Sequence, residues 1–223
     1  MGAYSLSTRA IGHTQYSGGY KLLQEQIVTS GVSTVEFNFP SPVVWNSGNS
    51  MYEGDRYDVI CMRFYNVHAA SNHVWFQFAM SANTSGNYGT SGMHQIVCSD
   101  RSEQKWWQGG TSNSDNRRNH TSATDMDKLV LASTGVSGDS TSCVAGYLNL
   151  YDIYDSDFQK FYHGEVFGDT DKLNASSADE RSQQFWPNGY YGIDSRLRRI
   201  RFNFSSGNID AGIFRMYGLK QNR

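Results

Sequence analysis

The sequence has few cysteines, and their spacing excludes two common kinds of small scaffold. Three cysteines, Cys61, Cys98 and Cys143, occur in 223 residues. An odd number of cysteines without a C-x-x-C pair matches neither a disulfide framework nor a zinc knuckle. We therefore expect three reduced, mostly buried thiols in a protein that is assembled in a cytosol.

Proline, charge and long apolar runs are also scarce. Three prolines stand against 22 glycines and 14% aromatic residues, a composition that favours strands and glycine turns over helices. Charged residues make up 18% and the formal net charge is −2, so we expect no basic surface for a nucleic acid. No apolar stretch approaches the ~20 residues of a membrane span, and residues 1–10 lack the apolar core of a signal peptide.

Sequence motifs of the common enzyme classes are missing too. The chain contains no Gly-x-Ser-x-Gly nucleophile turn, no glycine-rich phosphate loop and no His-Glu-x-x-His metal motif. Its six histidines include no pair at the spacing of a helical metal site. We therefore expect no enzymatic activity and assign no catalytic residue.

Alternating apolar residues predict strands along most of the chain. In Leu197–Phe204 the apolar Ile200, Phe202 and Phe204 alternate with polar residues, and within Asp210–Leu219 Phe214 and Met216 alternate with Arg215 and Tyr217. This is the pattern of a half-buried strand. The short Ser/Gly/Asn link between these two runs predicts a hairpin, whose apolar face needs a second sheet over it. Further strands are predicted at Lys21–Thr29, Thr34–Phe39, Tyr57–Asn66, Val74–Met80, Met93–Cys98, Lys128–Ala132, Cys143–Tyr151 and Gln159–Phe167.

About ten strands at these spacings predict an all-β fold, an antiparallel, jelly-roll-like β-sandwich with long polar loops. No proline-rich or charged linker divides the chain, so we expect one sandwich domain over residues 21–223. Residues 1–20 are predicted to be an extended N-terminal arm, either loose or laid on a neighbouring subunit. The polar segments predicted between strands include the long loop Asp100–Met126 and Thr170–Gln184, with one helical turn near Ala178–Gln183.

Four segments, in this order, resemble a family of small β-sandwich virion proteins of tailed bacteriophages, particularly aquatic ones. They are Leu22–Gly31, then Tyr57–Asn66 with Val74–Ser81, then Gly146–Tyr151, and finally Ser206–Lys220, which ends in the family-like Tyr-Gly-Leu-Lys. The chain departs from the family pattern in its long Asp100–Met126 loop and its arm. Because the shared motifs describe strands, no functional residue is carried over.

The resemblance implies a virion structural protein that is assembled in the host cytoplasm. It would be displayed on the particle surface as capsid decoration, head fibre or tail-fibre component, and would contribute to host attachment. Its partners would be other virion proteins of the capsid or tail, a host surface glycan, and further copies of itself. We expect a homotrimer held partly by the arm, with no nucleic-acid partner and no membrane insertion.

Aromatic residues in otherwise polar segments are candidate ligand-binding residues. Trp106, Trp107, Tyr190 and Tyr191 combine apolar area with few rotatable bonds, which suits sugar recognition or a protein contact. Alternatively, each ring plugs an end of the sandwich. The first interpretation supports a rival function, a lectin-like carbohydrate-binding module with an aromatic sugar-stacking site.

An acidic stretch offers a candidate metal site. Asp152, Asp155 and Asp157 lie within six residues, and Ca²⁺ takes carboxylate and carbonyl oxygens from such loops. The stretch lacks the glycine and distal glutamate of an EF-hand, and Asp also stabilises turns by bonding to the backbone. A glycosidase pair drawn from these residues or Glu165 is a third, less specific interpretation.

Overall fold

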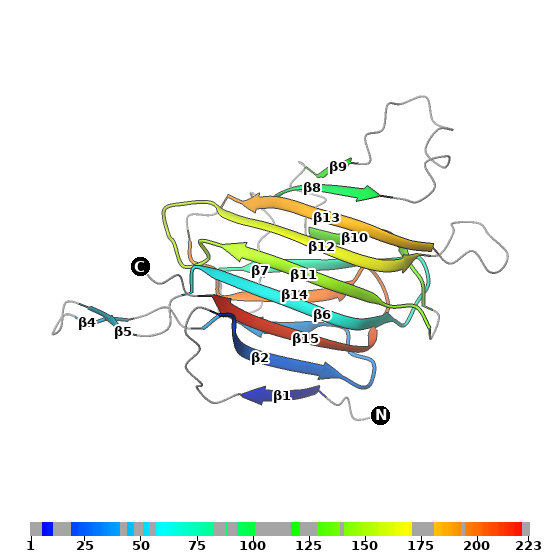
Figure 1. The fold of residues 1–223 in the computed structure, drawn as a ribbon, viewed down its shortest axis with the longest axis horizontal. Helices are drawn as coiled ribbons and strands as arrows, with labels where there is room; N and C mark the ends of the chain where they lie inside the picture. Colours follow the sequence, from blue (N-terminus) through cyan, green and yellow to red (C-terminus); the bar gives the residue numbers. More distant parts are fainter. Residues whose placement is uncertain are drawn as a thin grey trace.

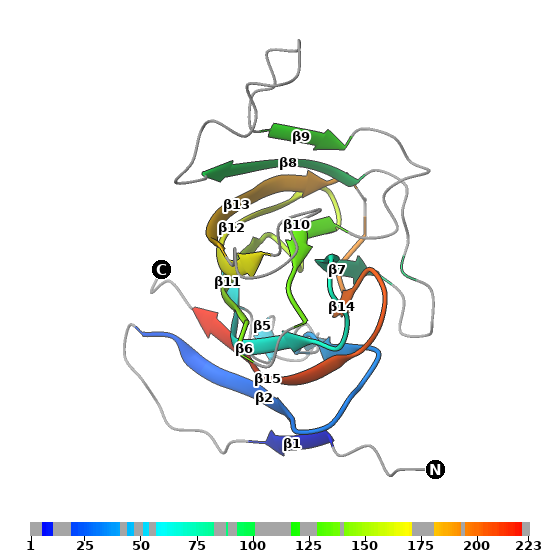
Figure 2. The same cartoon turned by 90° about the vertical axis from the view of Figure 1, so that its right-hand side faces the viewer.

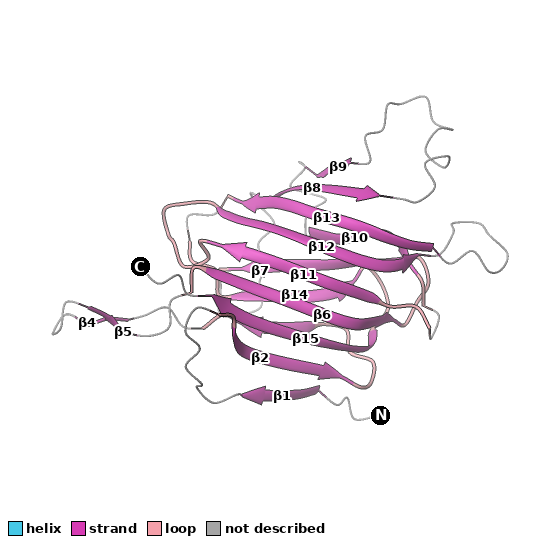
Figure 3. Ribbon diagram, in the orientation of Figure 1, coloured by secondary structure: helices cyan, strands magenta, loops and turns pink. Residues whose placement is uncertain are grey.

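The computed structural model shows two packed layers of antiparallel strands (Figure 3). The structure describes residues 6–10, 19–40, 44–46, 51–53, 57–82, 88, 93–100, 117–120, 129–138, 141–170, 181–192 and 195–219, some strands by their backbone alone. Within these ranges there is no helix, and hence no helix that could span a membrane.

Strand order identifies the sandwich as a jelly roll. One layer contains, side by side, β2 (Lys21–Val28), β15 (Ile209–Leu219), β6 (Val59–Ala69) and β11 (Val144–Tyr151). The other contains β3 (Val35–Asn38), β14 (Arg199–Phe204), β7 (Val74–Ser81) and β10 (Leu129–Val136). The chain crosses between layers from β2 to β3, β6 to β7, β10 to β11 and β14 to β15, as a jelly roll requires. The predicted fold class is therefore confirmed.

The first layer continues well past the jelly roll. Beyond β11 it adds β12 (Lys160–Thr170), β13 (Arg181–Tyr191), β8 (Met93–Asp100) and β9 (Arg117–His120), as Figure 1 shows. On the opposite edge, β1 (Leu6–Ala10) pairs with β2. Two short strands, β4 (Val44–Asn46) and β5 (Met51–Glu53), form a separate pair. We call β12, β13, β8 and β9 the extension.

Every strand predicted from the sequence has a counterpart, but β13 was not predicted, and neither were the short strands β1, β4, β5 and β9. β9 lies within the predicted Asp100–Met126 loop. Pro187 and Gly189 interrupt the pattern of β13, and the expected helical turn near its start is wrong for Arg181–Gln183, which are in the strand. Residues 178–180 of that prediction lie outside the described residues. Pairing with β12 on one side and β8 on the other holds β13 extended, so tertiary context overrides the local preference.

The predicted hairpin between β14 and β15 is wrong, because these strands lie in different layers. β14 pairs with β3 and β7, whereas β15 pairs with β2 and β6. Their apolar residues therefore meet face to face across the core. The ring centroids of Phe202 on β14 and Phe214 on β15 are 5.6 Å apart.

A cluster of phenylalanines fills the space between the two layers. Figure 2 shows these layers end-on, with β6 and β11 on the left and β7 and β14 on the right. Phe76 on β7 lies at the centre of the cluster, with centroids 5.2 Å from Phe64, 6.1 Å from Phe202 and 5.2 Å from Phe204. All four side chains are almost completely buried. The apolar residues of alternating strands thus build one continuous core, and the remaining alternate residues face outward.

Candidate binding face on the larger layer

The outward side of the larger layer is unusually rich in aromatic rings. Successive side chains of β12 point to opposite sides of the layer, which places some of its rings outward. Tyr162 and Val166 are buried in the core, whereas Phe161 and Phe167 are 50% and 48% exposed. We call this side the aromatic face. Its rings are Tyr20, Tyr65, Tyr147, Tyr151, Phe161, His163, Phe167, Trp186, Tyr190 and Tyr217.

Strand register brings rings and amides together on β11, β12 and β13. Phe161 is opposite Tyr190, and their ring centroids are 6.2 Å apart with planes inclined at 52°. Two residues further along β12, His163 is opposite Asn149 on β11 and Asn188 on β13. The extension therefore presents apolar rings next to neutral hydrogen-bonding groups.

His163 is held in place by its neighbours on β11. Its Nδ1 lies 2.9 Å from the Tyr151 hydroxyl, and its Nε2 lies 3.4 Å from the Asn149 amide nitrogen. Its ring stacks on Tyr151, with centroids 5.5 Å apart, and meets Tyr147 edge-on. Because both ring nitrogens have side-chain partners, the imidazole fixes the arrangement of these rings.

The cations on the β6 and β15 part of the face already have partners on the protein. Arg63 lies 5.8 Å from the ring centroid of Tyr20 and 5.5 Å from that of Tyr217. Arg215 donates from Nε to Glu25 Oε2 at 2.6 Å. Ring and carboxylate contacts of this kind compensate guanidinium charge, so this side of the molecule is aromatic rather than strongly charged.

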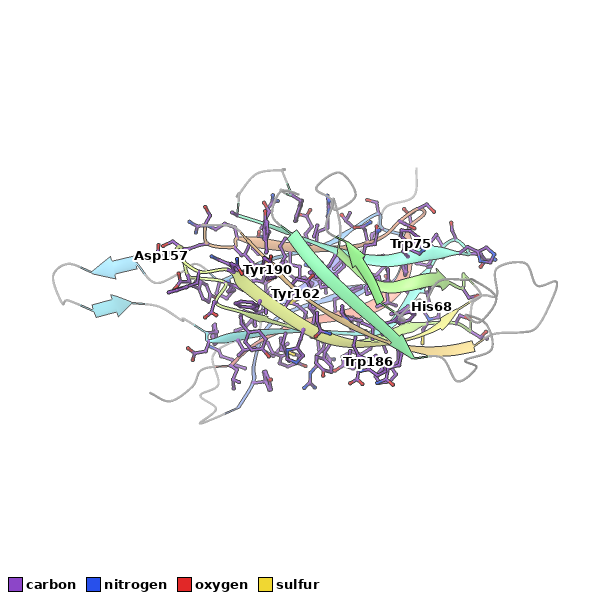
Figure 4. All side chains as sticks on the ribbon, turned by 90° about the horizontal axis from the view of Figure 1, so that it is seen from above. His68, Trp75, Asp157, Tyr162, Trp186 and Tyr190 are labelled. Carbon is purple, nitrogen blue, oxygen red and sulfur yellow. The ribbon has the colours of Figure 1, made fainter. Side chains whose placement is uncertain are left out.

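The outward side of the other layer has a different character. Arg199 and Arg201 both lie against the ring of Tyr88, at 5.0 and 4.1 Å from its centroid. Trp75, on β7, is 36% exposed there. Figure 4 shows Trp75 and Trp186 on opposite sides of the molecule. The two outward sides therefore offer different surfaces to a partner.

The reactivity of the Cys61 thiol tests whether the rings of the aromatic face shield the residues beneath them from solvent. Cys61 lies between Asn149 and Tyr217 in register, outside the core cluster, yet is only 2% exposed. Burial raises the pKa of the Cys61 thiol, and hydrogen bonding to Arg63 offsets only part of this. A raised pKa leaves less thiolate at a given pH.

We expect iodoacetamide at pH 8 to modify Cys61 roughly ten times more slowly in the native protein than in urea-unfolded chain, as measured by peptide mass spectrometry. Tyr217→Ala, which removes a neighbouring ring, should increase the native rate. Equal rates in native and unfolded protein would show that the rings do not shield this thiol.

Two of the four predicted aromatic candidates lie in the described residues. Tyr190 and Tyr191 are on β13, where alternation points them to opposite sides, so Tyr190 joins the aromatic face and Tyr191 is buried in the core. Trp106 and Trp107 belong to the segment between β8 and β9 and lie outside the described residues.

The acidic stretch forms the turn between β11 and β12, at the end of the molecule where Figure 4 labels Asp157. Asp155 Oδ1 accepts hydrogen bonds from the backbone N–H of Asp157 at 2.6 Å and of Phe158 at 3.1 Å. Asp152 is exposed and has a positive φ of 56°. Glu165 lies midway along β12 instead, where Gln184 donates to it.

Metal binding by this turn stays a prediction. In the described part of the chain, no three His, Cys, Asp or Glu side chains gather in a way that could hold a metal ion. The two hydrogen bonds that Asp155 accepts stabilise the turn through its backbone, which is the alternative interpretation of the acidic stretch.

Sequence reasoning did not identify the central residues of the aromatic face, which are Tyr147, Tyr151, Phe161, His163 and Phe167. All five lie in strands that were predicted correctly. The available signal was the placement of aromatic residues at adjacent positions, as in Phe-Tyr-His, since neighbours in a strand point to opposite sides. One ring of each such pair must face outward.

Comparison of the chain with protein-family models, with curated proteins and with solved structures finds no match.

Proposed function

We propose that the chain is a non-enzymatic structural protein of a tailed-bacteriophage virion, displayed on the particle surface as capsid decoration, head fibre or tail-fibre component, where it contributes to host attachment. The observation that carries this proposal is the position of the family-like segments. Far apart in the sequence, they supply the neighbouring strands β2, β15, β6 and β11 of one layer, together with β7. A shared fold requires such segments to form one connected unit.

The proposed partners are other virion proteins of the capsid or tail and two further copies of the chain. The arm supports exchange between copies, because β1 attaches to β2 through strand pairing in which Leu6 is opposite Val28. The same backbone bonds can form with β2 of a neighbouring copy. Strand exchange of this kind is a low-cost route to a closed oligomer, and we propose a homotrimer.

Light scattering of the purified chain, with and without isolated heads or tails of a phage that carries it, tests the proposal. We expect a mass about three times that of the 25.1 kDa chain and stable binding to one of the two particle parts. A chain lacking residues 2–20 should form the trimer less stably. A monomer that binds neither heads nor tails would contradict the proposal.

A second candidate function is a carbohydrate-binding module that acts apart from a virion. The half-exposed rings of Phe161 and Phe167 beside neutral amides favour it, because such a surface suits a ligand with both apolar and hydroxyl-rich sides. Binding of a glycan without binding to any particle part would select this candidate.

A further inference from the structure

The part of the aromatic face on the extension has the properties of a ligand site. Phe161 and Tyr190 form a pair of rings, tilted by 52° so that they do not cover one another face to face. Phe161 is half exposed although β12 is an inner strand of the larger layer, with β11 and β13 on either side. With Tyr190 beside it and the exposed Phe167 on the same side of β12, Phe161 belongs to a group of outward-facing rings, and exposed apolar patches mark contact surfaces.

Neutral polar groups lie next to this ring pair. Asn188, two residues from Tyr190 on the same side of β13, is exposed, and its amide nitrogen donates to the Trp186 carbonyl at 2.9 Å. Its amide oxygen thus has a fixed orientation. His163, opposite Asn188, is anchored to Tyr151, which keeps the neighbouring strand from rearranging. We call Phe161, Tyr190 and Asn188 the extension patch.

The absence of charged side chains in the extension patch limits the class of ligand that it can bind. The extension patch carries no charged side chain, and the nearest carboxylate along β12, Glu165, accepts a hydrogen bond from Gln184. A nucleic acid requires cations for its phosphates. Next to the patch, Lys160 of β12 donates to the Phe158 carbonyl, and on β6 and β15 Arg63 and Arg215 are held by rings and by a carboxylate. The patch therefore suits a neutral ligand with apolar C–H faces and hydroxyl groups.

We propose that the extension patch is a saccharide-binding site, in which sugar C–H faces pack on Phe161 and Tyr190 and a hydroxyl donates to Asn188 Oδ1. This inference rests on the proposed attachment role and names the ligand class for it. The rings supply apolar contact with few rotatable bonds, and the fixed amide sets the orientation of the sugar. The site lies on β12 and β13, which contain none of the family-like segments, so it belongs to the extension.

A glycan array probed with the whole chain, followed by calorimetric titration of the best-bound neutral oligosaccharide, tests the site. We expect Phe161→Ala and Tyr190→Ala each to weaken binding about tenfold or more. Phe161→Tyr should retain binding, because it keeps the ring. Circular dichroism should be unchanged in all variants.

Two matched controls isolate the patch. Phe158→Ala removes a phenyl group that is 67% exposed but lies in the preceding turn, and Trp75→Ala removes an exposed ring from the other layer. Both should bind the oligosaccharide as the unaltered chain does. Equal losses in the controls would overturn the assignment.

Other outcomes are equally decisive. No bound glycan, or binding that survives both patch variants and is lost in Trp106→Ala or Trp107→Ala, would overturn the inference. A change of oligomeric mass in Phe161→Ala would identify the patch as a protein contact instead. Particle binding without glycan binding would refute this inference alone, whereas glycan binding without particle binding would refute the virion role and leave the site standing.

Discussion

Phe76→Ala is expected to lower the free energy of unfolding by about 3–5 kcal/mol, the largest single loss that we predict. Phe76 is completely buried and its ring meets those of Phe64, Phe202 and Phe204 at centroid distances of 5.2 to 6.1 Å. Alanine removes these contacts and leaves a cavity between two layers whose strands are hydrogen-bonded on both sides. Such layers cannot collapse onto the gap.

Urea denaturation followed by tryptophan fluorescence and circular dichroism measures this effect. Val74→Ala provides a graded comparison, because Val74 lies on the same strand and side but has a smaller side chain, and it should cost less. Phe161→Ala, on the aromatic face, should change stability by about 1 kcal/mol or less. A loss for Phe76→Ala no greater than that for Phe161→Ala would contradict the central position of Phe76.

Gly218→Val is expected to destabilise the protein by about 1–3 kcal/mol, because it overfills a tightly packed contact. Gly218 lies on β15 in the family-like Tyr-Gly-Leu-Lys ending. A Cβ atom there would lie under 3.0 Å from three ring atoms of the buried Tyr57. The glycine therefore allows the Tyr57 ring to pack directly on the backbone of β15.

A double-mutant cycle identifies the cause of this loss. Tyr57→Leu removes the ring, so Gly218→Val should cost less in the Tyr57→Leu background than in the unaltered chain. Gly19→Ala is the control, because a Cβ atom at that position meets no atom within 4 Å. Additive losses for Gly218→Val and Tyr57→Leu would show that the two residues do not share a contact.

The sequence predicted the strands because alternation of apolar residues reports directly on burial. The segment that includes Ile60, Met62 and Phe64 is one example, and all three side chains prove to be buried. The sequence did not show to which layer each strand belongs. β14 buries Phe202 and Phe204 and β15 buries Phe214 and Met216 at alternate positions, and this pattern is the same for a hairpin and for a crossing between layers. Pairing with distant strands decides between them.

The candidate site was predictable only in part, for a related reason. An aromatic dipeptide such as Tyr190-Tyr191 stands out in a polar segment, but the strand sends one ring to the core and one outward. Phe161 and His163 did not stand out, because they sit in a strand that reads as ordinary core. Which rings gather on one surface depends on the register of β11, β12 and β13, which are separate in the sequence.

The strands of the extension are inserted into the jelly roll at two connections. β8 and β9 lie between β7 and β10 in the chain, and β12 and β13 lie between β11 and β14; together they extend the layer beyond β11. Neither insertion interrupts the four crossings that define the fold, and β12 pairs with β10 at Thr170 and Val136. The extension is therefore separate from the jelly roll in chain connectivity but shares its core, because the ring centroids of Tyr162 on β12 and Phe78 on β7 are 5.2 Å apart. Substituting the outward-facing residues of β12 and β13, and not the buried Tyr162 and Phe185, should alter the proposed saccharide site while the core keeps its packing.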